Sequence, residues 1–238
     1  MARTAQKSHP AEPELPLAKA VAALAKLYPL SKPLRDPLAI LVWENVGYLI
    51  DDERRGALFE EFRKRIGLKA AQIANAPTPI LADIAKRGGM NPQVRTDRLK
   101  EIGRLAICEC DGDVVAKLNA LPLPKARALL KKFPSVGEPG ADRIILFAGI
   151  AARPAISSDG LRALIRLGYV AQQKSYGATY RIAIQILEKD GVQSTAWYET
   201  AYLALREHGR ALCKRAAPVC EPCPLDRRCA HRPVTGGI

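Results

Sequence analysis

The sequence predicts an all-α fold, and three observations lead to that prediction. Apolar residues recur every three or four positions through most of the 238 residues, as they do on the buried face of a helix. Short segments rich in proline and glycine separate these periodic stretches. The alternation of apolar and polar residues that is typical of strands is almost absent. We therefore expect helices at residues 16–28, 37–49, 51–66, 78–87, 92–109, 113–119, 123–132, 140–150, 159–168, 176–189 and 195–213.

The composition predicts a helical core between two short tails. Hydrophobic residues make up 48% of the chain, which is enough for one large domain or two compact ones that share a core. Residues 1–13 and 233–238 are expected to be tails. No apolar run approaches the roughly 20 residues that cross a bilayer, and the polar N-terminus lacks a signal-peptide core. We therefore expect a cytoplasmic monomer without a membrane partner, nucleoid-associated if the source is bacterial.

The chain is strongly basic, with 37 Lys and Arg residues against 24 Asp and Glu residues and a formal net charge of +13. Such an excess favours polyanionic partners, and nucleic acid is the first candidate. A protein that is merely basic, or one that binds anionic lipid, would show the same excess. Charge alone therefore does not decide among these classes.

Residues 123–149 predict a helix-hairpin-helix. An apolar stripe on the first helix consists of Leu123, Ala126, Leu129 and Leu130. A Phe-Pro-Ser-Val-Gly turn follows at residues 133–137, and we expect the second helix to begin near Gly140. Glycine in such a turn lets backbone N–H groups face outward at a helix N-terminus, where they can bind a phosphate. The candidate phosphate-binding residues are Ser135, Val136, Gly137 and Gly140. The alternative is an ordinary loop between two helices.

Four of the six cysteines lie close together near the C-terminus. Cys213, Cys220, Cys223 and Cys229 have the spacing C-x6-C-x2-C-x5-C. In a reducing cytosol, clustered cysteines point to a metal site rather than to disulfides. Four soft thiolates in one short loop can surround a single metal centre, and an iron–sulfur cluster is the first candidate. Structural zinc is the main alternative, although four-cysteine zinc sites commonly use two close pairs and only one is present here.

Together, the hairpin, the cysteine loop and the His-Gly-Arg segment at 208–210 resemble the helix-hairpin-helix DNA glycosylase superfamily, in its endonuclease III branch. The resemblance covers about residues 16–232. It implies two domains: a six-helix barrel at 37–152 that contains the hairpin, and a helical [4Fe-4S] domain built from 14–36 and 153–232. Residues 206–232 carry seven Arg or Lys residues against three acids, so we also expect the cysteine loop to touch DNA. The alternative is that these charges only solvate the loop and offset the negative charge of the thiolates.

The resemblance implies a catalytic carboxylate. Family members carry an aspartate about twenty residues after the hairpin, and the matching segment here is Ile-Ser-Ser-Asp-Gly-Leu at 156–161, which places Asp159 at that position. Cleavage of an N-glycosidic bond builds positive charge on the sugar, which a nearby carboxylate stabilises. The alternative is that this segment is only a helix N-cap, and the two roles can coexist.

One departure from the family pattern affects the expected chemistry. Bifunctional members place an amine nucleophile, a lysine, at the position that Pro139 occupies here. Proline within a chain offers no amine, and Lys131 and Lys132 precede the turn. We therefore expect a monofunctional enzyme that uses water. Ser135 replaces a family glycine, which leaves the turn geometry open.

Two segments match the pocket and wedge regions of the family by position. The first, at 41–48, offers Trp43, Glu44, Asn45 and Tyr48 as residues that stack on a base or bind its edge. Core packing is the alternative for aromatic residues at helical spacing. The second is the Gly-Gly-Met-Asn-Pro turn at 88–92, where Met90 is a candidate wedge with Asn91 beside it. Met90 tucked back into the protein is the alternative there.

These observations favour a base-excision repair glycosylase that acts on double-stranded DNA containing a damaged or mismatched base. A second hypothesis keeps lyase activity through another lysine. A third, of a different class, is a DNA lesion-binding protein without catalysis. The lesion is not named by the sequence, because the shape of the pocket decides it.

Overall fold

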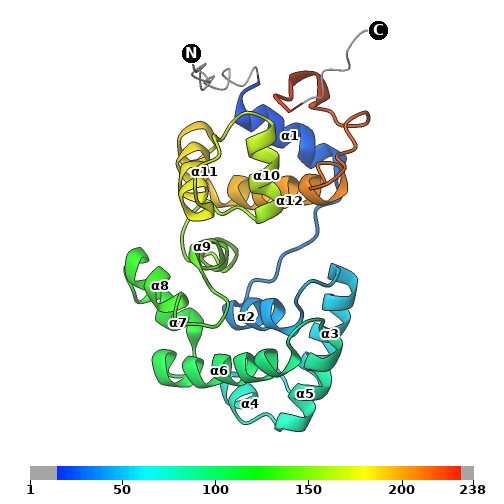
Figure 1. The fold of residues 1–238 in the computed structure, drawn as a ribbon. Coiled ribbons are helices and arrows are strands. Elements are labelled where there is room, and N and C mark those ends of the chain that lie inside the picture. The colour runs from blue at the N-terminus through cyan, green and yellow to red at the C-terminus, as the bar shows by residue number, and fades with distance from the viewer. Residues whose placement is uncertain (1–14, 232–238) are drawn as a thin grey trace, which may run out of the picture. The chain divides into compact units, whose positions relative to one another are not determined.

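The computed structural model describes residues 15–231, so the predicted tails at 1–13 and 233–238 lie outside the described residues. Within them the structure is helical, which confirms the all-α prediction, and its one isolated β-bridge pairs Tyr48 with Gly89 (Figure 1). The helices are α1 (Leu17–Leu27), α2 (Pro37–Val46), α3 (Asp52–Arg65), α4 (Ala70–Ala74), α5 (Thr78–Arg87), α6 (Pro92–Cys110), α7 (Val114–Asn119), α8 (Leu123–Leu130), α9 (Glu138–Phe147), α10 (Ser158–Arg166), α11 (Tyr176–Asp190) and α12 (Thr195–Ala211), followed by the 3-10 turn Asp226–Arg228.

One helix was not predicted, and several helix boundaries differ from the prediction by one to three residues. Helix α4 was not predicted, because its five residues are too few to show a helical period. Helix α2 ends at Val46 rather than at 49, because the backbone N–H of Tyr48 leaves the helix and donates to the carbonyl of Gly88 at 2.8 Å. Helix α9 begins at Glu138 rather than at 140, since Pro139 needs no hydrogen bond from its nitrogen in the first helical turn.

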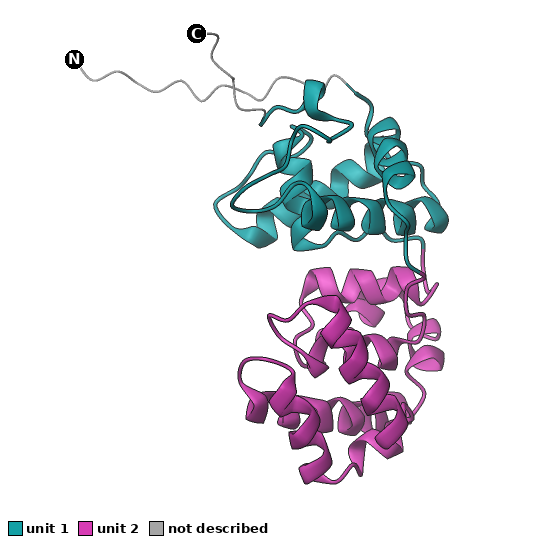
Figure 2. Ribbon diagram, turned by 90° about the vertical axis from the view of Figure 1, so that its right-hand side faces the viewer, with its two compact units in different colours: residues 1–31, 152–238 teal, residues 32–151 magenta. Residues whose placement is uncertain are grey.

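The chain divides into two compact units (Figure 2). The split unit combines residues 1–31 with residues 152–238, and the continuous unit comprises residues 32–151. The split unit holds α1 and α10 to α12, so both ends of the chain contribute to it. The continuous unit holds α2 to α9.

The core of the split unit joins α1 to the helices of the C-terminal half. Leu17, Val21 and Leu24 on one face of α1 are buried against α12 and α11. Leu164 on α10 and Leu205 on α12 complete the same cluster and are almost fully buried. Each such side chain contributes about 2 kcal/mol by leaving water. This packing fixes the N-terminus of α10 and the C-terminus of α12, which carry the candidate site of this unit.

The core of the continuous unit forms around α2 and the long helix α6. Leu41 on α2 and Leu99 and Ile102 on α6 are fully buried, and α4 and α5 pack against the other side of α6. A Cβ on Gly103 would overlap the backbone of Ala74, so glycine at this position permits the close crossing of α4 over α6. Helix α2 is thereby buried over most of its length, and its C-terminal end is held in place.

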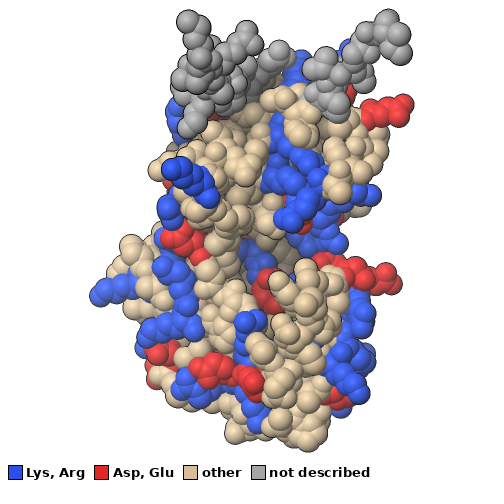
Figure 3. Space-filling view, viewed as in Figure 1, with Lys and Arg blue, Asp and Glu red and all other residues tan. Residues whose placement is uncertain are grey.

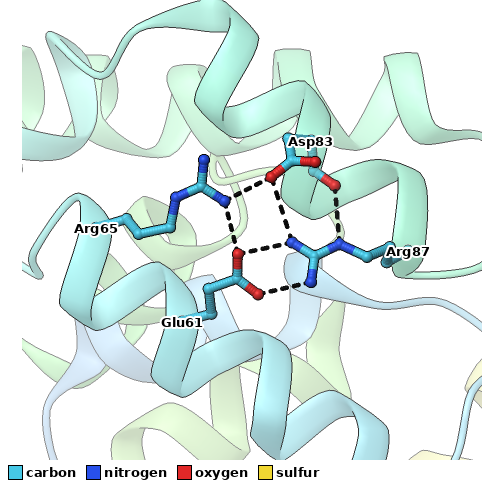
Figure 4. Close-up of polar contacts among 4 residues, drawn as sticks. All are labelled: Glu61, Arg65, Asp83 and Arg87. Atoms are coloured by element: carbon cyan, nitrogen blue, oxygen red, sulfur yellow. Dashed lines mark hydrogen bonds and ion pairs between the residues drawn. The ribbon is translucent and has the colours of Figure 1, made fainter.

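Four charged side chains join α3 to α5 in this unit (Figure 4). Arg65 lies 2.6 Å from Glu61 and 2.5 Å from Asp83, and Arg87 lies 2.7 Å from Glu61. The two arginines lower the pKa of Glu61 to about 2, chiefly by hydrogen bonding. Helix α3 begins directly after the 47–50 loop, and α5 ends directly before the 88–91 loop. The network therefore helps to hold the two helices that flank these loops.

Candidate functional site

The helix-hairpin-helix presents an open helix N-terminus. Helix α8 ends at Leu130 and α9 begins after Gly137, which has extended backbone and no side-chain hydrogen bond that caps the helix. Ser135 and Gly137 are exposed, while Val136 and Gly140 are half-buried. The first N–H groups of a helix have no partner within it, and they carry the positive end of the helix dipole. This geometry suits an anion such as a phosphate.

Asn45 braces the hairpin from α2. Its side chain is buried, and its amide nitrogen donates to the carbonyl of Leu41 at 2.9 Å and to that of Pro134 at 3.4 Å. Its amide oxygen accepts from the hydroxyl of Ser135 at 3.0 Å. Ser135 has left-handed backbone with φ of 65°, a conformation that glycine adopts without strain. The amide of Asn45 is thus turned toward the hairpin, where the hydroxyl of Ser135 binds it.

Glu44 lies between two arginines. Arg143 is one helical turn beyond Pro139 on α9, and it donates to a carboxylate oxygen of Glu44 at 2.7 Å. Arg55 on α3 lies 3.8 Å from the same oxygen. The side chains of both arginines are 17% exposed and that of Glu44 is 31% exposed, so the group is partly shielded from water. This arrangement offers both acceptors and donors for the edge of a base.

The ring of Trp43 packs inside the continuous unit. It meets Phe59 edge-on, with ring centroids 5.6 Å apart and an interplanar angle of 67°. Gly56 of α3 lies against the same ring, which is half-buried. Its contacts are therefore those of a residue that joins α2 to α3, and only its exposed part is available to a base.

Two loops come together at one end of α2. Tyr48 in the first loop (47–50) is bridged to the second loop (88–91), where Met90 lies. Tyr48 is 54% exposed, Leu49 is 72% exposed and Met90 is 56% exposed. Asn91 is also exposed and has left-handed backbone at the start of α6. We call the three apolar side chains at positions 48, 49 and 90 the apolar tip.

Leu49 is the residue of this tip that the sequence analysis missed. It was expected inside a helix that ends at 49, but its φ is 56° and its side chain projects into solvent. The contact that ends α2 early comes from residues about 40 positions away in the chain. The local signal is Gly47, the first residue of that loop.

Asp159 is the second residue of α10. The cap of this helix is Ser157, whose hydroxyl accepts from the N–H of Gly160 at 3.1 Å, so the carboxylate of Asp159 is not the cap. That carboxylate accepts from Arg162 at 2.8 Å, and its side chain is 34% exposed. Arg162 also donates to the carbonyl of Cys213 at 3.1 Å. The carboxylate is therefore held on a fixed support and still reaches solvent.

Gly209 allows α12 to approach this position closely. A Cβ on Gly209 would overlap the backbone of Asp159. The carbonyl of Gly209 accepts from Arg162 at 2.6 Å. The glycine of the His-Gly-Arg segment therefore serves the crossing of α10 and α12, beside the candidate catalytic carboxylate.

The four cysteines of the motif line one cavity in the split unit, with His208, Leu212 and Val219 around them. Burial raises the pKa of the Cys223 and Cys229 thiols, and the neighbouring cysteines raise both further. Within residues 15–231, no three or more His, Cys, Asp or Glu side chains converge closely enough to hold a single metal ion.

A single zinc ion needs four sulfurs about 2.3 Å from one point, a geometry that this loop does not have. An iron–sulfur cluster binds each thiolate at a separate iron and so accepts sulfurs that lie farther apart. Four soft thiols around one cavity are a donor set that suits an iron–sulfur cluster and also suits zinc. The other two cysteines lie outside this cavity: Cys110 is buried and Cys108 is exposed.

Hydrogen-bond donors surround the cysteine sulfurs. His208 is buried, which lowers its pKa to about 4, so it is neutral at pH 7. The hydroxyl of Tyr28 lies 3.0 Å from Nδ1 of this ring, and Nε2 lies 3.9 Å from the sulfur of Cys223. The backbone N–H of Leu225 donates to the same sulfur at 3.4 Å, and Arg166 lies 3.5 Å from the sulfur of Cys213. The N–H of Leu225 partly offsets the effect of burial on the pKa of Cys223.

Basic side chains are spread over both units on the face shown in Figure 3, and acidic side chains are scattered among them. The cysteine loop and the end of α12 contribute several of the arginines. Some of these basic side chains bind within the protein: Arg166 donates to the carbonyls of Lys214 and Arg215. Among the described helices, none is both long and apolar enough to span a membrane.

The chain resembles DNA glycosylases over most of its length, although no family model matches it. Endonuclease III of Thermotoga maritima is 27% identical over 212 residues, which cover 87% of this chain and 88% of that protein. A trapped covalent intermediate of endonuclease III with DNA has a TM-score of 0.72 at 19% identity, and the match covers 90% of this chain and 94% of that one. A thermostable thymine-DNA glycosylase gives 0.72 at 18% identity with the same coverage. H. pylori 3-methyladenine DNA glycosylase bound to 1,N6-ethenoadenine gives 0.61 at 14% identity, covering 81% of this chain and 96% of that one.

The fold and the sequence likeness point to one class: the chain resembles the helix-hairpin-helix DNA glycosylases. Within this class it is similar to endonuclease III, which is both its relative in sequence and one of its structural neighbours. The resemblance inferred from the hairpin and the cysteine loop is thereby confirmed.

Proposed function

We propose that this protein is a DNA glycosylase of base-excision repair, which takes a damaged or mismatched base out of duplex DNA and hydrolyses its N-glycosidic bond. The observation that carries the proposal is the position of Asp159 in a chain with this fold. The residue matches the catalytic aspartate of the family. Its carboxylate is not used as a helix cap, is fixed by Arg162 and remains accessible.

The chemistry assigned to Asp159 follows from the reaction. As the bond between sugar and base breaks, positive charge develops on the sugar, and a fixed carboxylate beside it stabilises that charge. The same carboxylate can orient or deprotonate the attacking water. Arg162 contributes orientation, because its guanidinium also donates to the carbonyl oxygens of Gly209 and Cys213.

Water is the proposed nucleophile. Pro139 stands where bifunctional relatives have lysine, and the proline nitrogen is part of an amide in the first turn of α9. Lys132, the nearest lysine before the turn, is engaged with Glu109 at 2.8 Å. The product would be an intact abasic site. Lyase activity through a different lysine is the alternative.

DNA would be held at the hairpin and opened at the loops. The N–H groups of Gly137 and Gly140 at the start of α9 would bind a phosphate, with Ser135 beside them. The N–H of Val136 instead donates to the carbonyl of Phe133 at 3.2 Å, so this residue would contribute only by shaping the turn. The apolar tip would fill the gap that the extruded base leaves. Trp43, Glu44 and Asn91 would contact the base or its surroundings, while Asn45 would act by bracing the hairpin.

The cysteine loop would hold a [4Fe-4S] cluster on Cys213, Cys220, Cys223 and Cys229. Bound there, the cluster would supply a rigid cross-link to the loop, because hydrolysis of the glycosidic bond transfers no electrons. The arginines of this loop would then face the DNA backbone from an ordered surface.

A panel of duplexes tests the proposal. Each would carry one lesion: uracil, a thymine mismatch, hypoxanthine, an alkylated base or an oxidised base. We expect base release from at least one duplex, with strand breaks that appear only after hot alkali. Breaks without alkali, together with a covalent adduct after borohydride treatment, would support the bifunctional alternative. Tight lesion binding without base release on any duplex would instead support the non-catalytic one.

A further inference from the structure

Arg95 is a buried cation that the proposed chemistry does not use. Its side chain lies on the first turn of α6 and is 2% exposed. Its hydrogen bonds go to two backbone carbonyls, those of Ala85 and Gly89, the latter at 2.9 Å. The Nε and Nη1 atoms are buried and have no hydrogen-bond partner in the structure. Burial lowers the pKa of this guanidinium, as expected for a cation without a carboxylate beside it.

A buried guanidinium in this state is costly, because each buried N–H group without a partner loses its hydrogen bond to water. Part of the cost is offset by the end of α5. The carbonyl of Ala85 belongs to the last turn of that helix, where the dipole is negative. The second carbonyl belongs to Gly89, in the loop that carries Met90. Arg95 therefore joins the end of α5 to that loop. Because its burial costs folding free energy, a contribution to stability does not by itself explain why this residue is present.

The 88–91 loop is packed directly against the 47–50 loop. A Cβ on Gly88 would overlap the carbonyl of Val46, and a Cβ on Gly89 would overlap the carbonyl of Tyr48. Both glycines therefore let two backbones touch, and the hydrogen bond from Tyr48 to Gly88 fixes their register. Arg95 fixes the second loop from the α6 side, so the two loops form one supported unit.

We propose that Arg95 is a positioning residue for the apolar tip, holding Tyr48, Leu49 and Met90 in the one arrangement that enters a base stack. The proposal rests on the proposed function, since it assumes that the protein opens duplex DNA. The occupant of the tip is the duplex, because these side chains project from a strongly basic chain that attracts a polyanion. Apolar side chains that enter a stack gain most when they are ordered beforehand.

Arg95→Met tests this role, since methionine fills the space but cannot bind either carbonyl. Arg104→Met is the matched control, because Arg104 lies on the same helix but pairs with Glu101 at the surface. The probe is a duplex with a tetrahydrofuran abasic analogue beside 2-aminopurine, whose fluorescence rises when its neighbour unstacks. We expect the parent and Arg104→Met to raise the fluorescence equally. Arg95→Met should lose most of that rise, while its affinity for undamaged duplex stays within about twofold, since it binds no phosphate.

Catalysis gives a second readout. On the substrate found in the lesion panel, the single-turnover rate constant of Arg95→Met should fall about tenfold to a hundredfold, since a misplacement of about 1 Å is costly. Arg95→Lys should recover part of this loss through one of the two carbonyls. Arg95→Met combined with Leu49→Ala should be no worse than the more damaging single variant, because both act through the tip.

Several outcomes would overturn the proposal. A folded Arg95→Met protein with the fluorescence rise and the rate of the parent would do so, as would additive effects of Arg95→Met and Leu49→Ala. If Arg95→Met does not fold, Arg95→Lys takes its place in both assays. A fluorescence rise and a rate constant equal to those of the parent would then contradict the proposal that Arg95 must bind both carbonyls. A parent that unstacks the probe but releases no base contradicts the proposed function and leaves the role of Arg95 standing. A parent that does not unstack the probe contradicts the role of Arg95.

Discussion

The hydrogen bonds between Asn45 and the hairpin allow a prediction of how substitutions there change the free energy of unfolding. Asn45→Leu keeps the volume of the side chain but removes its hydrogen bonds to Ser135 and Pro134. A buried hydrogen bond is worth about 1 kcal/mol net, and the 3.4 Å contact with Pro134 is worth less. We therefore expect the free energy of unfolding to fall by about 2 kcal/mol, with the hairpin carbonyl left unsatisfied.

Ser135→Gly should behave differently, because it removes the same hydrogen bond and also relieves strain. A non-glycine residue with positive φ costs about 1 kcal/mol, which is close to the value of the lost bond. The single substitution should therefore change stability by less than about 0.5 kcal/mol. In the double variant the bond is already absent, so the two effects should differ from additivity by about 1 kcal/mol.

Urea unfolding of the parent, both single variants and the double variant measures this coupling, provided that the denaturant slope stays constant. Additivity within about 0.5 kcal/mol would refute the reasoning, because it would mean that Asn45 and Ser135 do not share a hydrogen bond. The same four proteins should rank in the same order for affinity to undamaged duplex, because a loosened hairpin presents its N–H groups less well.

Three further predictions concern other parts of the molecule. Arg87→Gln should lower the free energy of unfolding by about 1 kcal/mol at pH 6, a modest loss because water and salt screen exposed ion pairs. The pKa of Glu61 is lowered in the folded protein, so its ion pairs stabilise the fold fully above about pH 4.5 and lose this effect as the pH falls toward 2. In urea titrations the difference between variant and parent should therefore shrink over this pH range, and a constant difference would argue against this role of Glu61. Cys220→Ala should lose the visible absorbance and the bound iron of the purified parent, whereas equal iron in both proteins would exclude this ligand. Gly209→Ala should destabilise the protein by about 2 kcal/mol or more in thermal unfolding, because its Cβ overlaps the backbone of Asp159; an unchanged melting temperature would contradict the close crossing.

Helical periodicity predicted most of the fold, because the apolar faces that specify α1, α5, α10 and α12 are local in sequence. The prediction was wrong where a distant segment decides the backbone. Helix α2 stops at Val46 because the carbonyl of Gly88 takes the N–H of Tyr48, a contact that no local pattern encodes.

Residues of the candidate site that belong to a sequence motif could be predicted, whereas residues whose position depends on tertiary packing could not. The cysteine spacing and the match of Asp159 to the family came directly from the sequence. The segment that carries Asp159 does cap α10, as the alternative expected, but the coordinates assign the cap to Ser157 and leave the catalytic role of Asp159 a prediction. The burial of Arg95 and the projection of Leu49 depend on how two loops meet, which single residues do not indicate.

The most direct test of the central claim is single-turnover base release by Asp159→Asn on the duplex that the parent processes. Asp190→Asn, which removes an exposed carboxylate at the end of α11, is the matched control for charge. We predict that Asp159→Asn binds this duplex as the parent does but releases the base at least about a hundredfold more slowly, while Asp190→Asn is unchanged. Release at the parental rate by Asp159→Asn would contradict the assignment of this carboxylate to catalysis.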